Sequence, residues 1–347
     1  MSEISRAAPL VCICVPTFNA ERTLAETLES ILGQTYRELT VLVVDNASTD
    51  KTLEIADSYA AADRRVRVHR NSANVGGEGN FTRCLALACG DYTGIFHSDD
   101  IYTAEMVARQ VALLESRPEA GAVFSMAQLI DERGVPGRIY KLPPELRRDK
   151  ESVYDFKEIF RALLKYGNFF FCPGVLARTA VYRDYIRKWD GGGFLSSADL
   201  DVWLRILLRH KIGIIDEPLL RYRGGAASSF SYTAARKKTA PHDMLPVFDA
   251  YIQGAAAGLM GRRERADYSL LVLKDKTNRA FNYFTVGDGR TGRGLLGGLF
   301  SPGSLLHSLR SAFHLKVMLY GYAVYFLSWL PLSGKARAFI ASSRFKG

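Results

Sequence analysis

The chain has 347 residues, of which 48% are hydrophobic and 24% charged, which is the composition of a globular protein and excludes a fibrous or largely disordered one. The formal net charge is +10, but the segment after Asp288 carries eight Lys and Arg residues and no acid, so most of the excess lies in the last 59 residues. Because the rest of the chain is nearly neutral, the charge does not indicate a nucleic-acid-binding protein.

Residues 1–130 alternate short β-rich runs with helical patterns. The predicted strands are 10–15, 39–44, 66–69, 92–96 and 122–126. The predicted helices between them are 21–32, 52–61, 81–88 and 103–115. Strands that alternate with helices favour an α/β fold, with a mostly parallel sheet flanked by helices.

The second half of the chain has a different pattern. Residues 131–149 are polar and rich in glycine and proline, which predicts a loop or a domain edge. The elements predicted after this segment are a helix at 156–166, a strand at 172–177, a helix at 199–208 and a strand at 212–215. From residue 231 the pattern is helical and basic, with no clear strand.

The five cysteines lack the spacing of a disulfide framework. Cys12 and Cys14 lie two residues apart on a predicted strand, where we expect them to be core side chains. The first apolar run is short and strand-like, so it does not indicate a signal peptide. These features predict a reduced, cytoplasmic setting.

Polar residues follow each of the first four predicted strands. Ligands of open parallel sheets bind beyond the carboxyl ends of the strands, so neighbouring strands would bring these residues to one edge. The clusters are Pro16, Thr17, Phe18 and Asn19 after the first strand, Asp45, Asn46, Ala47 and Ser48 after the second, Asn71 with Asn74, Val75 and Gly76 after the third, and His97, Ser98, Asp99 and Asp100 after the fourth.

Asp99 and Asp100 form the most informative of these clusters. Two adjacent unpaired carboxylates repel each other and resist burial, so they either cap the next helix in water or hold a cation. Carboxylate oxygens suit Mg²⁺ or Mn²⁺, which also bind substrate phosphates. Asp45 accepts a hydrogen bond from a ligand or closes an Asx-turn, and the segment 74–76 is equally consistent with a simple turn.

Four stretches, in order, carry a resemblance to a known family. They are VCICVPTFNAERTLAETLESILGQTY, LTVLVVDNASTDKTLEIA, NSANVGGEGNFTRCLALACGDYTGIFHSDD and SADLDVWLRIL. They resemble the family 2 glycosyltransferases, which have the GT-A fold, and the resemblance covers about residues 10–223. It is specific for the fold and the reaction class, but not for the sugar, and it is weaker in the last third of the chain.

The resemblance implies that a nucleotide-sugar lies across the strand ends. The implied nucleotide-sugar-binding residues are Pro16, Thr17, Phe18, Asn19, Asp45, Asn74, Gly76, Asn80, His97, Ser98, Asp99 and Arg223. Among these, Asp45 would bind the base and Arg223 would contact the diphosphate. One or both of Asp99 and Asp100 would hold Mn²⁺ or Mg²⁺ against the diphosphate and contact the ribose. Arg221 and Arg223 are equally consistent with a solvated strand end.

The family's catalytic base falls on Asp199, at the start of a predicted helix. A plain helix N-cap is the alternative reading, because a helix N-terminus favours an ionised carboxylate. Asp201 is the fallback candidate. A base is needed because a sugar hydroxyl is a poor nucleophile at neutral pH, and in-line attack then inverts the anomeric centre.

The sequence departs from the common family pattern at three positions. His97 stands where an acid is usual, Ala198 replaces a glutamate, and Gly225 takes the place of a histidine, for which His242 is a distant substitute. His97 would be a ribose hydrogen-bond donor, a nitrogen ligand of the metal, or only a strand-end residue.

The sequence therefore predicts an inverting glycosyltransferase that transfers a sugar from a nucleotide-sugar to a hydroxyl of a glycan or glycolipid acceptor in cell-surface polysaccharide biosynthesis. The alternatives are a polyprenyl-phosphate glycosyltransferase and a non-catalytic nucleotide-sugar-binding subunit. The predicted parts are a nucleotide-sugar-binding half at 1–130, an acceptor-binding half at 131–230 and a basic helical region at 231–347.

The segment 317–332 is uncharged, but it is shorter than the about 20 residues that span a bilayer. It either packs in the core or lies in a membrane interface, where its basic flanks favour anionic lipid. We expect peripheral attachment at the inner face of the cell membrane.

The sequence GDGRTG at 287–292 matches a dinucleotide-binding pattern, but it lacks the preceding strand and a downstream acid, so we reject that reading.

Overall fold

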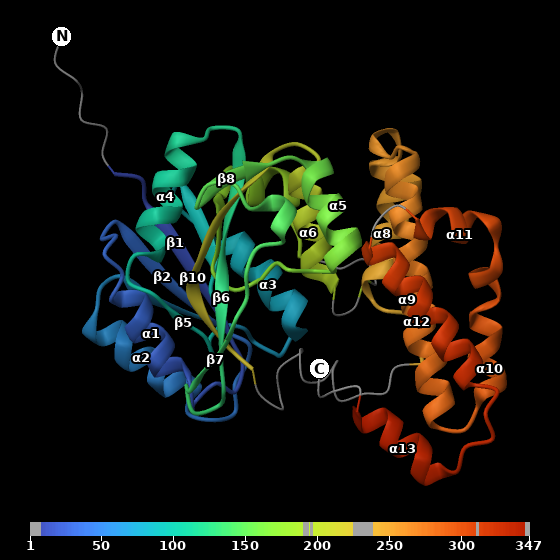
Figure 1. The fold of residues 1–347 in the computed structure, drawn as a ribbon. Helices are drawn as coiled ribbons and strands as arrows, with labels where there is room; N and C mark the ends of the chain where they lie inside the picture. Colours follow the sequence, from blue (N-terminus) through green and yellow to red (C-terminus); the bar gives the residue numbers. More distant parts are fainter. Residues whose placement is uncertain (1–7, 190–193, 195–196, 225–238, 310–311, 344–347) are drawn as a thin grey trace. The chain divides into compact units, whose positions relative to one another are not determined.

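Figure 1 shows the computed structural model of the chain, which describes residues 8–189, 194, 197–224, 239–309 and 312–343. The chain divides into two units, Met1–Phe230 and Ser231–Gly347, and each is described by itself. The N-terminal unit is built on a mixed sheet, and the described residues of the C-terminal unit are helical or in turns and loops.

The N-terminal unit contains a ten-stranded sheet in its described residues, with the order β3-β2-β1-β4-β9-β6-β10-β5, while β7 pairs with β6 and β8 with β10. The strands are β1 (Val11–Thr17), β2 (Leu39–Asp45), β3 (Val66–Arg70), β4 (Tyr92–Ile95), β5 (Ile101–Tyr102), β6 (Ala120–Ile130), β7 (Pro136–Ile139), β8 (Glu151–Tyr154), β9 (Val175–Arg178) and β10 (Lys211–Arg223). Strands β3, β2, β1 and β4 are parallel neighbours, whereas β9 is antiparallel to β4 and β6. The carboxyl ends of the first four strands therefore share one edge.

Side chains on both faces of β1 are buried. Ile13 and Val15 pack with α1 (Leu24–Leu32) in one apolar cluster, while Cys12 and Cys14 pack with Cys84 of α3 (Gly76–Leu87) in another. This period of two, with both faces covered, is typical of a central parallel strand, and it confirms the two cysteines as core residues. The helices of the unit are α1 (Leu24–Leu32), α2 (Thr52–Ala62), α3 (Gly76–Leu87), α4 (Met106–Ser116), α5 (Phe156–Tyr166) and α6 (Ala198–Leu207).

The predicted order of elements in residues 1–130 is confirmed, with shifts at several ends. Helix α3 begins at Gly76 rather than at the predicted residue 81. The prediction missed this first turn because it is rich in glycine and carries no helical pattern of apolar residues. Strands β6 and β10 run to Ile130 and Arg223, well past the predicted ends at 126 and 215. The extension of β10 brings Arg223 to the edge that carries the candidate site.

The prediction of a loop at 131–149 is only partly right. The segment contains β7, which pairs with the end of β6, and it is followed by β8, which was not predicted. Strands β7 and β8 have four residues each and β5 has two, so none is long enough to show a reliable period.

The described helices of the C-terminal unit confirm the predicted helical pattern. They are α8 (Met244–Ala250), α9 (Arg262–Thr285), α10 (Gly289–Leu295), α11 (Pro302–Ser308), α12 (Ala312–Leu327) and α13 (Gly334–Ser343). Helix α12 buries Val317, Met318 and Val324 in clusters shared with α9. At Gly321 a Cβ atom would lie 2.4 Å from the terminal methyl of Leu299, so a larger residue would force that side chain to move.

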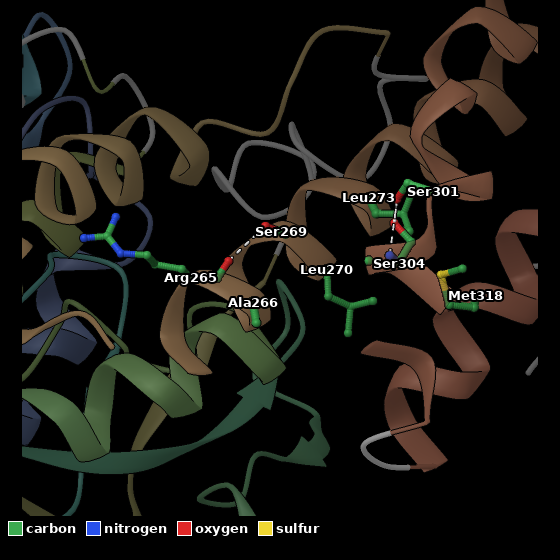
Figure 2. A pocket seen from close by; sticks show the side chains of 9 residues that line it. Arg265, Ala266, Ser269, Leu270, Leu273, Ser301, Ser304 and Met318 are labelled. Atoms are coloured by element: carbon green, nitrogen blue, oxygen red, sulfur yellow. Dashed lines mark hydrogen bonds between the residues drawn. The ribbon is translucent and has the colours of Figure 1, made fainter. Parts of the chain in front are cut away.

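A pocket of about 340 Å³ lies among α9, α11 and α12 (Figure 2). It is lined by Arg265, Ala266, Ser269, Leu270, Leu273, Ser301, Gly303, Ser304 and Met318.

The GDGRTG sequence begins α10, where the Asp288 carboxylate accepts a hydrogen bond from Thr291 N–H (3.1 Å). Within the described part of the chain, no helix is both long and apolar enough to cross a bilayer.

Candidate active site

The loops after β1 and β2 are joined by hydrogen bonds, so the first two predicted polar clusters lie together. Asn19 N–H donates to Ser48 Oγ (3.0 Å), and Thr49 N–H donates to Asn19 Oδ1 (2.9 Å). Thr17 and Asp45 are partners in the register of the two parallel strands. Because the register aligns the two strand ends, both loops begin at the same level of the sheet edge.

Asp45 is buried, and its two carboxylate oxygens have different surroundings. Oδ2 accepts a hydrogen bond from Ser48 N–H (3.1 Å), three residues on, so it closes a local turn that is one residue longer than an Asx-turn. Oδ1 is buried and has no hydrogen-bond partner among the described residues. A buried acceptor without a donor is costly, so this oxygen is suited to accept a hydrogen bond from a ligand.

Four asparagines link the ends of β2 and β3 to the start of α3. Asn46 Nδ2 donates to Asn74 Oδ1 (2.9 Å) and to Gly76 O (3.2 Å), and Asn71 Nδ2 donates to Asn80 Oδ1 (2.9 Å). Gly76 has a φ of +78°, which favours glycine. Asn46 and Asn71 belong to the predicted polar clusters but were not predicted to bind the nucleotide-sugar, and their bonds hold the predicted binding residues Asn74 and Asn80 in place.

The turn at residues 97–100, called the acid turn below, is held by side chains at every carbonyl. The Tyr102 hydroxyl donates to the carbonyl of residue 97 (3.2 Å), and the Thr23 hydroxyl donates to that of residue 98 (2.9 Å). Arg223 Nε donates to the carbonyl of residue 99 (2.7 Å), and the Thr27 hydroxyl donates to that of residue 100 (2.8 Å). Ser98 therefore contributes its carbonyl to this scaffold.

Of the other predicted residues, Pro16 continues β1, whereas Phe18 lies beyond it with 47% of its surface exposed.

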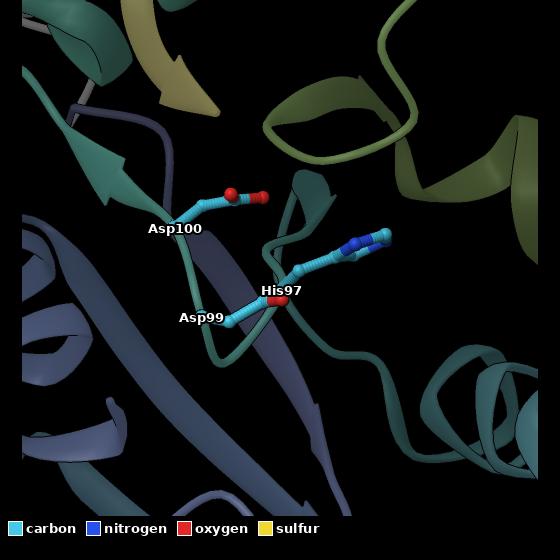
Figure 3. Close-up of side chains that lie close together, drawn as sticks. All are labelled: His97, Asp99 and Asp100. Carbon is cyan, nitrogen blue, oxygen red and sulfur yellow. The ribbon is translucent and has the colours of Figure 1, made fainter. Parts of the chain in front are cut away.

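His97, Asp99 and Asp100 form a candidate metal site. Their ligand atoms lie within 4.8 Å of one another, and the side chains project to the same side of the acid turn (Figure 3). His97 Nε2 and Asp100 Oδ2 are buried and have no hydrogen-bond partner among the described residues. Burial, and then the Asp99 charge, raises the pKa of Asp100 well above its usual value, while burial lowers the pKa of His97. A divalent cation would satisfy both atoms and balance the carboxylate charge, so the residues fit a metal ion with oxygen and nitrogen ligands.

An aromatic series connects the acid turn to α6. The His97 ring stacks on Phe81 of α3 with ring centroids 5.5 Å apart, and Phe81 contacts Trp189 at 5.2 Å. Trp189 packs edge-on against Trp203 of α6, also at 5.2 Å. These contacts support the His97 ring on one side and the helix that carries the predicted base on the other.

Asp199 lies in the first turn of α6, and Ser197 rather than Asp199 occupies the N-cap position. Its Oδ1 accepts a hydrogen bond from Leu200 N–H (2.7 Å). Burial raises the pKa of Asp199 to about 6, although the backbone hydrogen bonds at the helix start act in the opposite direction. A carboxyl group with a pKa near neutrality is well matched to general-base catalysis.

Asp201 and Cys172 also bear on the candidate site. Asp201 forms an ion pair with Arg205 (2.9 Å), and Arg205 also donates to the Ile186 carbonyl, so Asp201 supports the helix. Cys172 was not selected from the sequence. Burial raises the pKa of its thiol, and the charges of Asp199 and Asp100 add to the effect.

Arg223 ends β10 with only 9% of its side chain exposed. Nε donates to the Asp99 carbonyl (2.7 Å), Nη1 to the carbonyls of Asp131 and Glu132 (both 3.2 Å), and Nη2 to Glu26 Oε2 (2.5 Å). The guanidinium is thus engaged with protein groups around the acid turn. Its predicted contact with the diphosphate stays a prediction.

The mixed sheet and the acid turn at the carboxyl ends of its parallel strands are those of a glycosyltransferase with the GT-A fold. The sequence matches the profile described as "Glycosyl transferase family 2" over residues 12–185, half of the chain. The chain belongs to glycosyltransferase family 2, and it is an enzyme of the glycosyltransferase class.

Curated relatives and solved structures agree with this assignment. The Bacillus subtilis protein EpsE is 31% identical over 57% of this chain and 67% of EpsE. Escherichia coli WfaP, named as a UDP-Glc:α-D-GlcNAc-diphosphoundecaprenol β-1,3-glucosyltransferase, is 27% identical over 57% of this chain and 70% of WfaP. The crystal structure of S. aureus TarS in complex with UDP-GlcNAc has a TM-score of 0.61 at 16% identity, over 91% of this chain and 90% of that chain, and supports the fold.

Proposed function

We propose that this enzyme is an inverting glycosyltransferase that moves a sugar from a nucleotide-sugar to a hydroxyl group of a glycan or glycolipid acceptor during assembly of a cell-surface polysaccharide. The observation that carries the proposal is the acid turn, whose His97, Asp99 and Asp100 ligand atoms converge within 4.8 Å. Aromatic contacts run from His97 through Phe81 and Trp189 to Trp203, and they link this turn to α6. The first turn of α6 carries Asp199, a carboxyl group of raised pKa.

The proposed reaction is a single displacement. The acceptor oxygen forms a bond to the anomeric carbon as the bond from that carbon to the diphosphate oxygen breaks, and the acceptor proton passes to Asp199. Leu200 N–H holds Asp199 Oδ1, so we assign the proton to the other carboxylate oxygen. Mn²⁺ or Mg²⁺ at the acid turn would stabilise charge on the departing nucleoside diphosphate. We assign the Asp45 oxygen without a partner to the base or ribose of the nucleotide.

The acceptor is tested by analysis of the product. The name of WfaP gives a sugar on a lipid diphosphate as its acceptor, which supports a glycolipid acceptor here. We expect incubation with nucleotide-sugars and Mn²⁺ to yield a glycoside of inverted configuration on a sugar hydroxyl. A sugar phosphate of a polyprenyl chain would instead identify the alternative acceptor. Tight nucleotide binding without transfer or donor hydrolysis would identify a binding subunit.

The pH dependence of transfer follows from the raised pKa of Asp199. The base works in its ionised form, so kcat should rise with pH through about 6 and level off above it. The measurement is a kcat profile between about pH 5 and pH 8, with nucleotide affinity followed in parallel to separate binding from the chemical step. A flat profile, or a rise centred well above neutrality, would exclude Asp199 as the group that limits the rate.

We also propose that the C-terminal unit docks on the inner face of the cell membrane. One face of α12 is buried and the other is exposed, which supports core packing for the first face and leaves the second free for a membrane interface. The exposed side chains Leu315 (44%), Leu319 (56%) and Phe326 (60%) lie at helical spacing on α12, and Trp329 follows at 62%. The lack of any acid after Asp288 makes this surface complementary to anionic lipid.

Charge on the exposed face of α12 should weaken membrane docking. We expect the double variant Leu319→Glu/Phe326→Glu to lose at least about tenfold in co-sedimentation with phosphatidylglycerol vesicles, since each buried apolar side chain contributes ~1.5–3 kcal/mol. Leu259→Glu, at another exposed leucine of the same unit, is the matched control and should bind as the wild type does. Equal binding by all three proteins would remove α12 from the docking surface.

A further inference from the structure

Arg223 lies between the two acids of the candidate metal site and a third acid from α1. Its backbone N–H donates to Asp100 Oδ1 (2.7 Å), and its Nε donates to the Asp99 carbonyl (2.7 Å). Among the side chains that hold the carbonyls of the acid turn, it is the one with a charge. Its position at the end of β10 joins the acid turn to a strand 123 residues later in the chain.

Glu26 is the counter-ion of Arg223. Glu26 Oε2 lies 2.5 Å from Arg223 Nη2, and 52% of the Glu26 side chain is exposed. Thr23 and Thr27, which hold the carbonyls of residues 98 and 100, lie three positions before and one after Glu26. The spacing of 23, 26 and 27 puts all three side chains on one face at the start of α1. This face and Arg223 together enclose the backbone of the acid turn.

A guanidinium is suited to this position because its five donors have a fixed planar geometry. Arg223 uses Nη1 for the carbonyls of Asp131 and Glu132, while Nε and Nη2 bond to Asp99 and Glu26. A lysine has one flexible ammonium group and cannot reach acceptors in these different directions at once. The arrangement therefore depends on the shape of the side chain as well as on its charge.

We propose that Arg223 is a positioning residue that holds the acid turn in the geometry required for the cation, with Glu26 as its counter-ion. This inference rests on the proposed metal-dependent function. In it, Arg223 acts through Asp99 and Asp100 and makes no contact with the diphosphate of the donor. Residues that orient metal ligands in this way typically change metal affinity or activity by about 10- to 100-fold when they are replaced.

The test compares nucleotide affinity with and without the metal. The dissociation constants of UDP and GDP are measured by calorimetry on the full chain, with Mn²⁺ and with EDTA, for the wild type, Arg223→Lys, Arg223→Gln and Glu26→Gln. For both Arg223 variants, we expect nucleotide affinity in Mn²⁺ to fall by about 10- to 100-fold, while nucleotide affinity in EDTA stays the same as that of the wild type. Glu26→Gln should lose less, because its side chain is half exposed.

Arg221→Lys is the matched control, since Arg221 is an exposed residue of the same strand and should behave as the wild type does. A direct diphosphate contact would instead lower affinity equally with and without Mn²⁺, and Arg223→Lys would retain most of it, which would overturn the inference. Unchanged Mn²⁺ dependence in Glu26→Gln and in folded Arg223→Lys would overturn it as well. A wild type without any Mn²⁺-dependent nucleotide binding would reject the metal site itself.

Discussion

Replacing Asp199 by asparagine should reduce the rate of sugar transfer by about 10²–10⁴-fold, while the affinity for the nucleotide stays the same. Asparagine keeps the size of the side chain and its hydrogen bond from Leu200 N–H, but it cannot take a proton from the acceptor hydroxyl. The measurement is the single-turnover rate at saturating donor and acceptor, together with the dissociation constant of the nucleotide.

Stability provides a control for this variant. The pKa of Asp199 in the folded protein, about 6, is above the usual value of 3.8, so the ionised carboxylate destabilises the folded state at neutral pH. This destabilisation decreases as the pH falls below about 6, and it is gone once the pH is below the usual pKa of 3.8. Asp199→Asn should therefore melt no lower than the wild type at neutral pH. Asp201→Asn, which loses the ion pair with Arg205, should keep most of the transfer activity. Normal turnover by Asp199→Asn would reject the assignment of the base.

Replacing Asp100 by asparagine should have the second large effect. The carboxylate of Asp100 is buried, and its Oδ2 has no hydrogen-bond partner among the described residues, so its charge is well placed for a cation. Loss of metal assistance removes several kcal/mol of transition-state stabilisation, and we expect transfer to fall by about 100-fold or more. Treatment of the wild type with EDTA should have the same effect and should be reversed by Mn²⁺.

Asparagine is the informative replacement because its oxygen can still accept the hydrogen bond from Arg223 N–H, so the acid turn keeps its support. Asp57→Asn, at an exposed acid that pairs with Arg70 on the surface, is the control and should transfer sugar at the normal rate. Full activity of Asp100→Asn in EDTA would mean that the acid turn does not hold a catalytic cation.

The parts of this site that the sequence predicts are those with local signals. Asp99 and Asp100 are adjacent and follow an apolar run, so their position at a strand end needs only the strand itself to be recognised. The alternation of strands and helices, with the rules for parallel sheets, then brings Asp45 and Asn19 to the same edge. Asp199 was placed by family resemblance, and its raised pKa follows from burial, which no local pattern reports.

The parts that the sequence does not predict depend on long-range contacts. Arg223 bonds to an acid 123 positions earlier, and this contact exists only because β10 extends beyond its predicted end. Asn46 meets Asn74 through the folding of two loops, although each residue alone reads as an ordinary turn. Burial, and then the charges of Asp199 and Asp100, raises the pKa of Cys172, which no local sequence pattern reports.

The central claim is that a divalent cation at His97, Asp99 and Asp100 holds the diphosphate of a nucleotide-sugar. The most direct test is a thermal-shift panel of UDP-, GDP-, dTDP- and CMP-sugars, with Mn²⁺ and with EDTA, on the wild type and on Asp100→Asn. A ligand that binds the folded state raises its melting temperature. We expect one nucleotide class to stabilise the wild type in Mn²⁺ and to lose that effect in EDTA and in the variant. Stabilisation by no nucleotide-sugar, or equal stabilisation of both proteins in Mn²⁺ and EDTA, would contradict the claim.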